Sequence, residues 1–126
     1  MTFLDRYSPM LLSILRIVAG LLFLEHGTSK LLGFPHNAMF DHLIPLIMVA
    51  GAIELIGGAL ITIGLFSRFA AFIASGEMAV AYWLGHVARS GSLLPAVNEG
   101  GEAILYCFIF LYIAAAGPGP WAVNRK

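Results

Sequence analysis

Charge is scarce in this chain, and its scarcity excludes several classes of function. Only 11% of the residues are charged and the formal net charge is zero, whereas soluble domains carry about 25% charged residues. Proteins that bind nucleic acids present a basic face, so we expect no nucleic-acid partner. Cysteine is scarcer still. Cys107 has no second cysteine to pair with, which excludes an intramolecular disulfide and any paired-cysteine motif that would hold zinc or carry electrons.

Other signatures of resident redox groups are missing as well. The sequence contains neither a dinucleotide-binding fingerprint nor a haem-attachment motif. We therefore expect no covalently bound cofactor. A redox reaction would need a quinone bound directly by the chain, or a partner protein that carries the redox centre.

Apolar residues fill the sequence instead, at 60% of the total, and they gather in four long segments. A helix that crosses a bilayer needs about 20 mostly apolar residues. Segments of this kind cover residues 9–32, 43–65, 69–87 and 100–116. We predict an all-α fold with a single domain over residues 1–126, an integral membrane four-helix bundle whose solvent is the lipid bilayer.

The basic residues predict the orientation of this bundle. Four spans place both ends of the chain on one side of the membrane. That side collects Arg6, Arg68, Arg125 and Lys126. The other side collects Lys30 and Arg89. Because cytoplasmic loops are enriched in lysine and arginine, we expect both termini to be cytoplasmic.

Three charged residues lie inside the predicted spans: Arg16, Glu54 and Glu77. A charge at the bilayer centre costs at least about 2.5–3.5 kcal/mol, so such residues face inward and pair. Arginine can snorkel along its helix and bridge carboxylates, so we expect Arg16 to pair with Glu54 or Glu77. Glycines at heptad spacing, two on each of the first two segments, favour close approach of these helix faces.

One arginine cannot neutralise two carboxylates, and this surplus of acid has two interpretations. A buried acid without a cation suits a proton relay or the binding of a polar ligand, which makes Arg16, Glu54 and Glu77 candidate catalytic residues. Alternatively, the buried charges only fix which helices meet.

A second polar cluster lies near the predicted outer ends of the helices. Its candidate ligand-binding residues are His26, Lys30, His86, Glu102 and Tyr106. Quinone carbonyls need hydrogen-bond donors beside an apolar slot, and both could come from His26, His86, Tyr82, Trp83 and Tyr106. They also suit headgroup contacts and an interfacial aromatic belt. No two histidines are three or four residues apart, as a helical ligand pair would be, so we expect no metal site.

Three short motifs, in this order and spacing, resemble the DoxX family of small bacterial four-helix membrane proteins. They are Arg16 with His-Gly-x-x-Lys at 26–30, Glu54 with Gly57, Gly58 and Gly64, and Gly-Glu-Ala at 101–103. The resemblance extends over nearly the whole chain. It implies a multi-pass protein of the bacterial cytoplasmic (inner) membrane. It also implies redox chemistry, because relatives form the membrane subunits of thiosulfate:quinone oxidoreductase, and others are associated with detoxifying quinones, catechols or oxidants.

The first hypothesis is therefore a membrane subunit of a quinone-linked oxidoreductase. Its three buried charges would bind a quinone headgroup or pass its protons, and the outer polar residues would line the entry. The second hypothesis is a non-catalytic scaffold that docks a redox-enzyme subunit. A third hypothesis is a small transporter. Four spans are few for a transporter, so this hypothesis would require the chain to assemble as a homo-oligomer.

Overall fold

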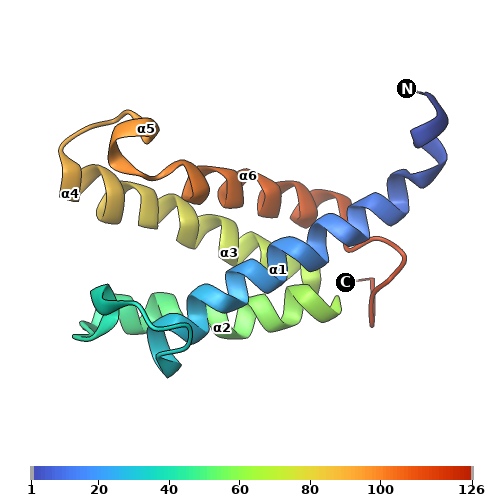
Figure 1. The fold of residues 1–126 in the computed structure, drawn as a ribbon. Helices are drawn as coiled ribbons and strands as arrows, with labels where there is room; N and C mark the ends of the chain where they lie inside the picture. Colours follow the sequence, from blue (N-terminus) through green and yellow to red (C-terminus); the bar gives the residue numbers. More distant parts are fainter. Residues whose placement is uncertain (1, 126) are drawn as a thin grey trace.

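The computed structural model describes residues 2–125, and its regular secondary structure there is entirely helical. Four long helices run side by side (Figure 1). They are α1 (Ser8–Leu32), α2 (Pro45–Ile63), α3 (Ser67–Ala81) and α6 (Gly101–Ala116). The shorter elements are η1 (Thr2–Tyr7), η2 (Ala38–Phe40), the π-helical η3 (Tyr82–Val87), α4 (Ala88–Ser90) and α5 (Pro95–Asn98). The all-α prediction is confirmed. Three predicted segments each correspond to one long helix, and the third, residues 69–87, covers most of α3 and all of the π-helical η3.

The long helices form two pairs. The most extensive contacts join α1 to α2 and α3 to α6; α2 also contacts α3, whereas α1 makes few contacts with α6. Both termini lie at one end of the molecule, and α4, α5 and the η2 loop lie at the other (Figure 1).

Glycine makes the α1–α2 contact close. A Cβ atom added to Gly27 would lie 2.4 Å from the backbone nitrogen of Leu55, and one added to Gly58 would lie 2.7 Å from the Cα of Leu24. Gly20 and Gly51 are similarly confined. Small residues thus bring the two backbones together, as the heptad spacing predicts.

Replacing Gly27 by alanine is therefore expected to destabilise the protein by about 1–3 kcal/mol, because the new methyl group must push two helix backbones apart. Thermal unfolding in detergent measures the loss. Gly76→Ala is the matched control, since a Cβ there would meet nothing within 4 Å. Equal unfolding midpoints for the two variants would contradict the close packing.

A cluster of buried aromatic rings connects α1 to α6. Phe23 packs against Phe110 with ring centroids 4.9 Å apart, and Tyr106 stacks on Phe110 at 5.5 Å. On the other side of α6, small residues of α3 are buried, namely Ala70, Ala71 and Ala74. These residues let α3 approach α6 closely, and the rings fill the space between the two helix pairs.

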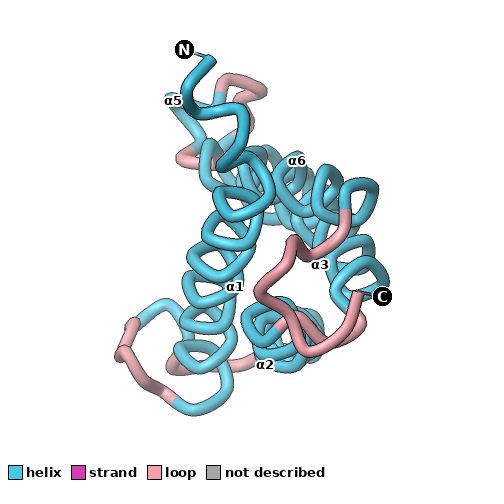
Figure 2. Tube along the Cα trace, turned by 90° about the vertical axis from the view of Figure 1, so that its right-hand side faces the viewer, coloured by secondary structure: helices cyan, strands magenta, loops and turns pink. Residues whose placement is uncertain are grey.

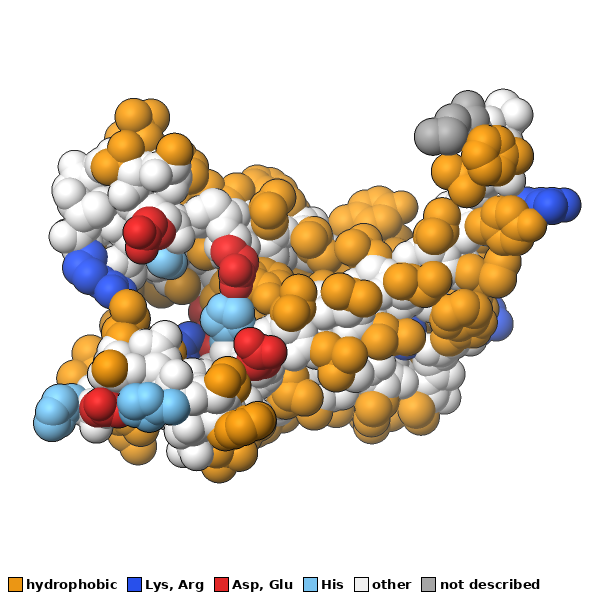
Figure 3. Space-filling model, in the orientation of Figure 1, with side chains coloured by type: hydrophobic (Ala, Val, Ile, Leu, Met, Phe, Trp, Pro, Cys, Tyr) orange, Lys and Arg blue, Asp and Glu red, His pale blue; other side chains and the backbone are white. Residues whose placement is uncertain are grey.

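Apolar side chains are spread along the helices on the face that Figure 3 shows. Phe69, Leu105 and Phe108 are each more than 60% exposed, and large apolar patches on a free surface mark contact with a membrane or a partner. Two helical stretches of the described residues are long and apolar enough to cross a membrane: Thr2–Leu32 and Pro45–Ile63. Gly101–Ala116 is apolar but shorter. The number of crossings stays a prediction.

Candidate functional site

A cavity of about 1290 Å³ lies between the two helix pairs, at the end away from the termini. Its walls are mostly apolar, with contributions from Ile53, Phe72 and Met78. Acidic, basic and histidine side chains gather at this end of the molecule (Figure 3). The polar residues that line it include His26, Lys30, Glu77, His86, Glu102 and Tyr106. All five predicted ligand-binding residues therefore line one cavity.

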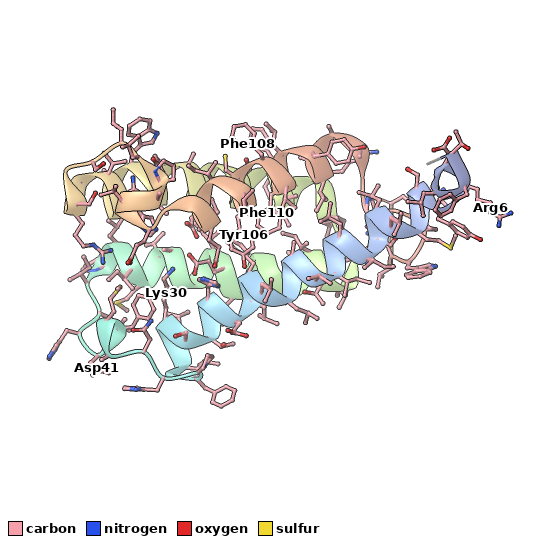
Figure 4. The ribbon with its side chains drawn as sticks, turned by 45° about the horizontal axis from the view of Figure 1, so that its top comes forward. Arg6, Lys30, Asp41, Tyr106, Phe108 and Phe110 are labelled. Atoms are coloured by element: carbon pink, nitrogen blue, oxygen red, sulfur yellow. The ribbon has the colours of Figure 1, made fainter. Side chains whose placement is uncertain are left out.

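Lys30 forms an ion pair with Glu54 inside this region. Its Nζ lies 2.6 Å from Oε1 and 2.7 Å from Oε2 of Glu54. The Glu54 side chain is fully buried and that of Lys30 is 15% exposed. Figure 4 shows Lys30 and Tyr106 between the two helix pairs. An ammonium has three donors, so one Nζ hydrogen of Lys30 remains free of Glu54.

The predicted pairing of Arg16 with Glu54 or Glu77 is wrong. The Arg16 guanidinium donates instead to the carbonyl oxygens of Pro118, Trp121 and Thr62, at 2.5 Å for Trp121 and 3.5 Å for Thr62. Prolines cannot continue a helical ladder, so the carbonyls of the segment after α6 lack intrahelical donors. An arginine with five N–H groups supplies them. Arg16 thus anchors the C-terminal segment, which Figure 2 shows running between α1 and α3 over the end of α2.

Replacing Arg16 by methionine is expected to release this segment at a cost of about 1.5–3 kcal/mol, the usual range for lost hydrogen bonds of a charged group. Limited proteolysis of the chain beyond Ala116 and thermal unfolding measure the two effects. Ligand binding in the distant cavity should persist in the variant that remains folded. Unchanged proteolytic protection would contradict the anchoring role.

Glu77 is the acid without a cation. Both oxygens of its carboxyl group are buried and accept no hydrogen bond from an N–H or hydroxyl group of a described residue; the nearest polar partner is the carboxyl group of Glu54. The side chain lines the cavity and interacts electrostatically with Glu54 and Lys30. Buried polar atoms in proteins are rarely left without partners. Lys30 bonds only Glu54, so Glu77 lies beside the cavity without a cation, and its oxygens have no N–H or O–H donor among the described residues.

Tyr106 brings an unused hydroxyl to the same cavity. The residue is 5% exposed, and its ring is held by Phe110 and by an edge-on contact with His26 at 5.7 Å. Its hydroxyl makes no hydrogen bond to any other described residue, although tyrosine can donate one and accept others. The packing fixes the ring while the polar tip stays available.

His26 and Glu102 form a pair at the rim of the cavity. The Nδ1 of His26 lies 2.8 Å from the carbonyl oxygen of Leu22, and its Nε2 lies 2.8 Å from Oε1 of Glu102. A carbonyl only accepts, so Nδ1 carries a hydrogen, and Nε2 shares one further proton with the carboxylate. The side chains are 41% and 62% exposed. The pair therefore lies at the rim of the cavity, in contact with the outside.

His86 belongs to η3, and π-helical turns are frequent at functional sites. Its Nδ1 donates to the carbonyl oxygen of Asn98 at 3.0 Å, while Nε2 makes no hydrogen bond to a described residue. Asn98, at the predicted outer end of the last span, is buried and donates to the Tyr82 hydroxyl at 3.1 Å. A Cβ on Gly100 would lie 2.7 Å from the Tyr82 ring. This loop holds His86 in place.

Metal binding has no support in the described part of the chain. No three histidine, cysteine, aspartate or glutamate side chains of residues 2–125 converge as an ion would require. The polar groups of the cavity are hydrogen-bond donors and acceptors set into apolar walls, which suits a small organic ligand.

Comparison with known proteins identifies the family. The family model described as DoxX matches residues 11–87, which include Lys30, Glu54 and Glu77. An uncharacterized protein from Haemophilus influenzae is 45% identical over 130 aligned residues, covering 98% of this chain and 95% of that protein. No solved structure matches the chain. On the matched region, the near full-length relative and the apolar helices, this chain belongs to the DoxX family of membrane proteins.

Proposed function

We propose that this protein binds a quinone in the cavity and acts as a membrane subunit of a quinone-linked redox system. It would lie in the bacterial cytoplasmic membrane as a four-helix, multi-pass bundle with both termini in the cytoplasm. Support for this placement comes from the exposed apolar helix faces and from the excess of basic residues at the end that carries the termini.

The observation that carries the proposal is the pair of unpartnered Glu77 oxygens in an apolar cavity. Burying acceptors without donors costs free energy, and a ligand with hydroxyl groups would supply the donors. A quinol has two hydroxyls on a flat apolar ring, so it fits both the acceptors and the walls. The free hydrogen of Lys30 and the Tyr106 hydroxyl would donate to the carbonyl oxygens of the oxidised form.

The residues around the cavity also suit the protons of this chemistry. Reduction of a quinone to a quinol takes up two electrons and two protons. Glu77 would hold a proton beside the ligand, and the His26–Glu102 pair would exchange protons with the outside. Since the sequence has no paired cysteines or haem-attachment motif, the electrons would come from a partner redox enzyme.

Equilibrium binding tests the proposal directly. Purified protein in detergent is titrated with a short-chain quinone and with its quinol, and binding is followed calorimetrically. We expect saturable binding of one ligand per chain. Absence of saturable binding of either form would contradict the proposal.

A non-catalytic scaffold that docks a redox enzyme is the second candidate. The Lys30–Glu54 ion pair favours it, because both partners bond each other and join α1 to α2 without a ligand. Replacing this pair by apolar residues would then leave docking intact. The scaffold hypothesis does not explain why the oxygens of Glu77 lack donors.

A further inference from the structure

A second pocket lies at the opposite end of the molecule, beside the termini. It has a volume of about 430 Å³ and lies between the start of α1, the end of α6 and the segment that follows α6. Arg68, Arg125 and Tyr112 line it, together with Ser8 and Pro118. Its lining contains no acidic residue among the described residues. The pocket is therefore basic, and its size is within the range of small-ligand sites.

Arg68 is held in position without being neutralised. Its Nη1 donates to the carbonyl oxygens of Ala115 at 2.5 Å and Ala114 at 3.3 Å, in the last turn of α6. No carboxylate of a described residue pairs with it, and its Nε and Nη2 donate to no described residue. Arg125 makes neither a hydrogen bond nor an ion pair with a described residue. The pocket thus presents two cations with unused donors.

The wall that carries Arg125 is fixed to the helices. Ser13 accepts a hydrogen bond from the Trp121 nitrogen at 3.1 Å and donates one to the Pro118 oxygen at 3.2 Å. The nitrogens of Val123 and Asn124 donate to the carbonyl oxygens of Ile63 and Gly64. The segment is therefore bonded to α1 and to the end of α2 immediately before Arg125.

Aromatic side chains mark this end as a membrane interface. Tyr112 is 60% exposed and Trp121 is 51% exposed, and both residue types are enriched at the level of the lipid headgroups. Apolar faces of α3 and α6 continue from the pocket along the molecule, with Phe69 and Phe108 on the surface. A ligand with a phosphate in the pocket could lay acyl chains on these faces.

We propose that this pocket binds the phosphate group of an anionic phospholipid. Arginine donates to phosphate oxygens in a fork that matches their geometry, and basic pockets on the cytoplasmic side of membrane helices recognise such headgroups. Phosphatidylglycerol has the required charge on a single phosphate. This site is distinct from the quinone cavity, which lies at the other end of the same helices.

Lipid retention in native mass spectrometry tests the site. The intact chain is incubated in detergent with phosphatidylglycerol or with phosphatidylcholine of the same acyl chains. We expect the wild type to retain one phosphatidylglycerol in preference to phosphatidylcholine. Arg68→Gln with Arg125→Gln should weaken retention about 25-fold, since each arginine near a membrane surface contributes about 1 kcal/mol. Arg125→Gln alone, which breaks no bond to a described residue, should weaken it about fivefold.

The control and a soluble ligand separate the alternatives. Arg6→Gln removes a cation at the same end that does not line the pocket, and it should leave retention unchanged. Equal retention by the wild type and the double variant would overturn the proposal. Binding of soluble glycerol 3-phosphate without retention of phosphatidylglycerol would also overturn it, because the site would then serve a free phosphate.

Discussion

Replacing Lys30 by methionine is expected to destabilise the protein by about 3–5 kcal/mol, the usual cost of removing one partner of a buried ion pair. The Glu54 side chain is fully buried, so its carboxylate would lose both of its close contacts and could not reach water. Such a loss is a large part of the stability of a small domain. Chemical unfolding in detergent and the yield of folded protein from membranes measure it.

Two further variants serve as controls for the expected loss of stability. Lys30→Met combined with Glu54→Leu removes both charges, and it should recover most of the lost stability because no uncompensated charge remains. Arg89→Met removes an exposed cation that lines the same cavity, and it should change the stability by less than about 0.5 kcal/mol. If Lys30→Met were as stable as Arg89→Met, the ion pair would not be the contact that holds α1 to α2.

Replacing Glu77 by leucine is expected to separate ligand binding from folding. The variant should bind a quinol about 2- to 12-fold more weakly, because a hydrogen bond between neutral groups contributes about 0.5–1.5 kcal/mol. Its stability without ligand should be equal to or above that of the wild type, since two buried oxygens without partners are replaced by apolar atoms of similar size. Functional sites commonly carry this opposition between activity and stability.

Calorimetric titration and thermal unfolding of the same samples measure both sides of this expectation. Asp5→Asn removes a carboxylate on η1, far from the cavity, and should change neither. A Glu77→Leu variant that unfolds more easily and binds a quinol as before would assign Glu77 to the structure rather than to the ligand.

The positions of the helices could be predicted from the sequence. Long apolar segments leave few alternatives, and Pro45 and the Gly117–Pro120 segment mark helix ends that the structure also has. The close approach of α1 and α2 could also be predicted. Glycines at heptad spacing form a flat strip on one face of a helix, and such a strip lets a neighbouring helix backbone come close.

The partners of the charged residues could not be predicted. No local sequence pattern shows which group Arg16 bonds. Its partners are backbone carbonyls after α6, which lie more than 100 residues from Arg16 in the sequence and carry no side-chain signature. The pairing of Lys30 with Glu54 depends on how far α2 is shifted along α1. That shift is determined by the close contacts between the glycines of one helix and the backbone of the other. The sequence predicts His26 and Glu102 in one polar cluster. Their direct contact could not be predicted, because it depends on α1 lying beside α6 at this end.

Native mass spectrometry of protein extracted gently with its membrane lipids tests the quinone proposal most directly. We predict a bound mass that corresponds to one quinone per chain in the wild type and in Asp5→Asn, and its loss in Glu77→Leu that remains folded. A wild-type chain that carries no quinone from a quinone-containing membrane, but a stoichiometric protein partner instead, would contradict ligand binding in the cavity and favour the scaffold.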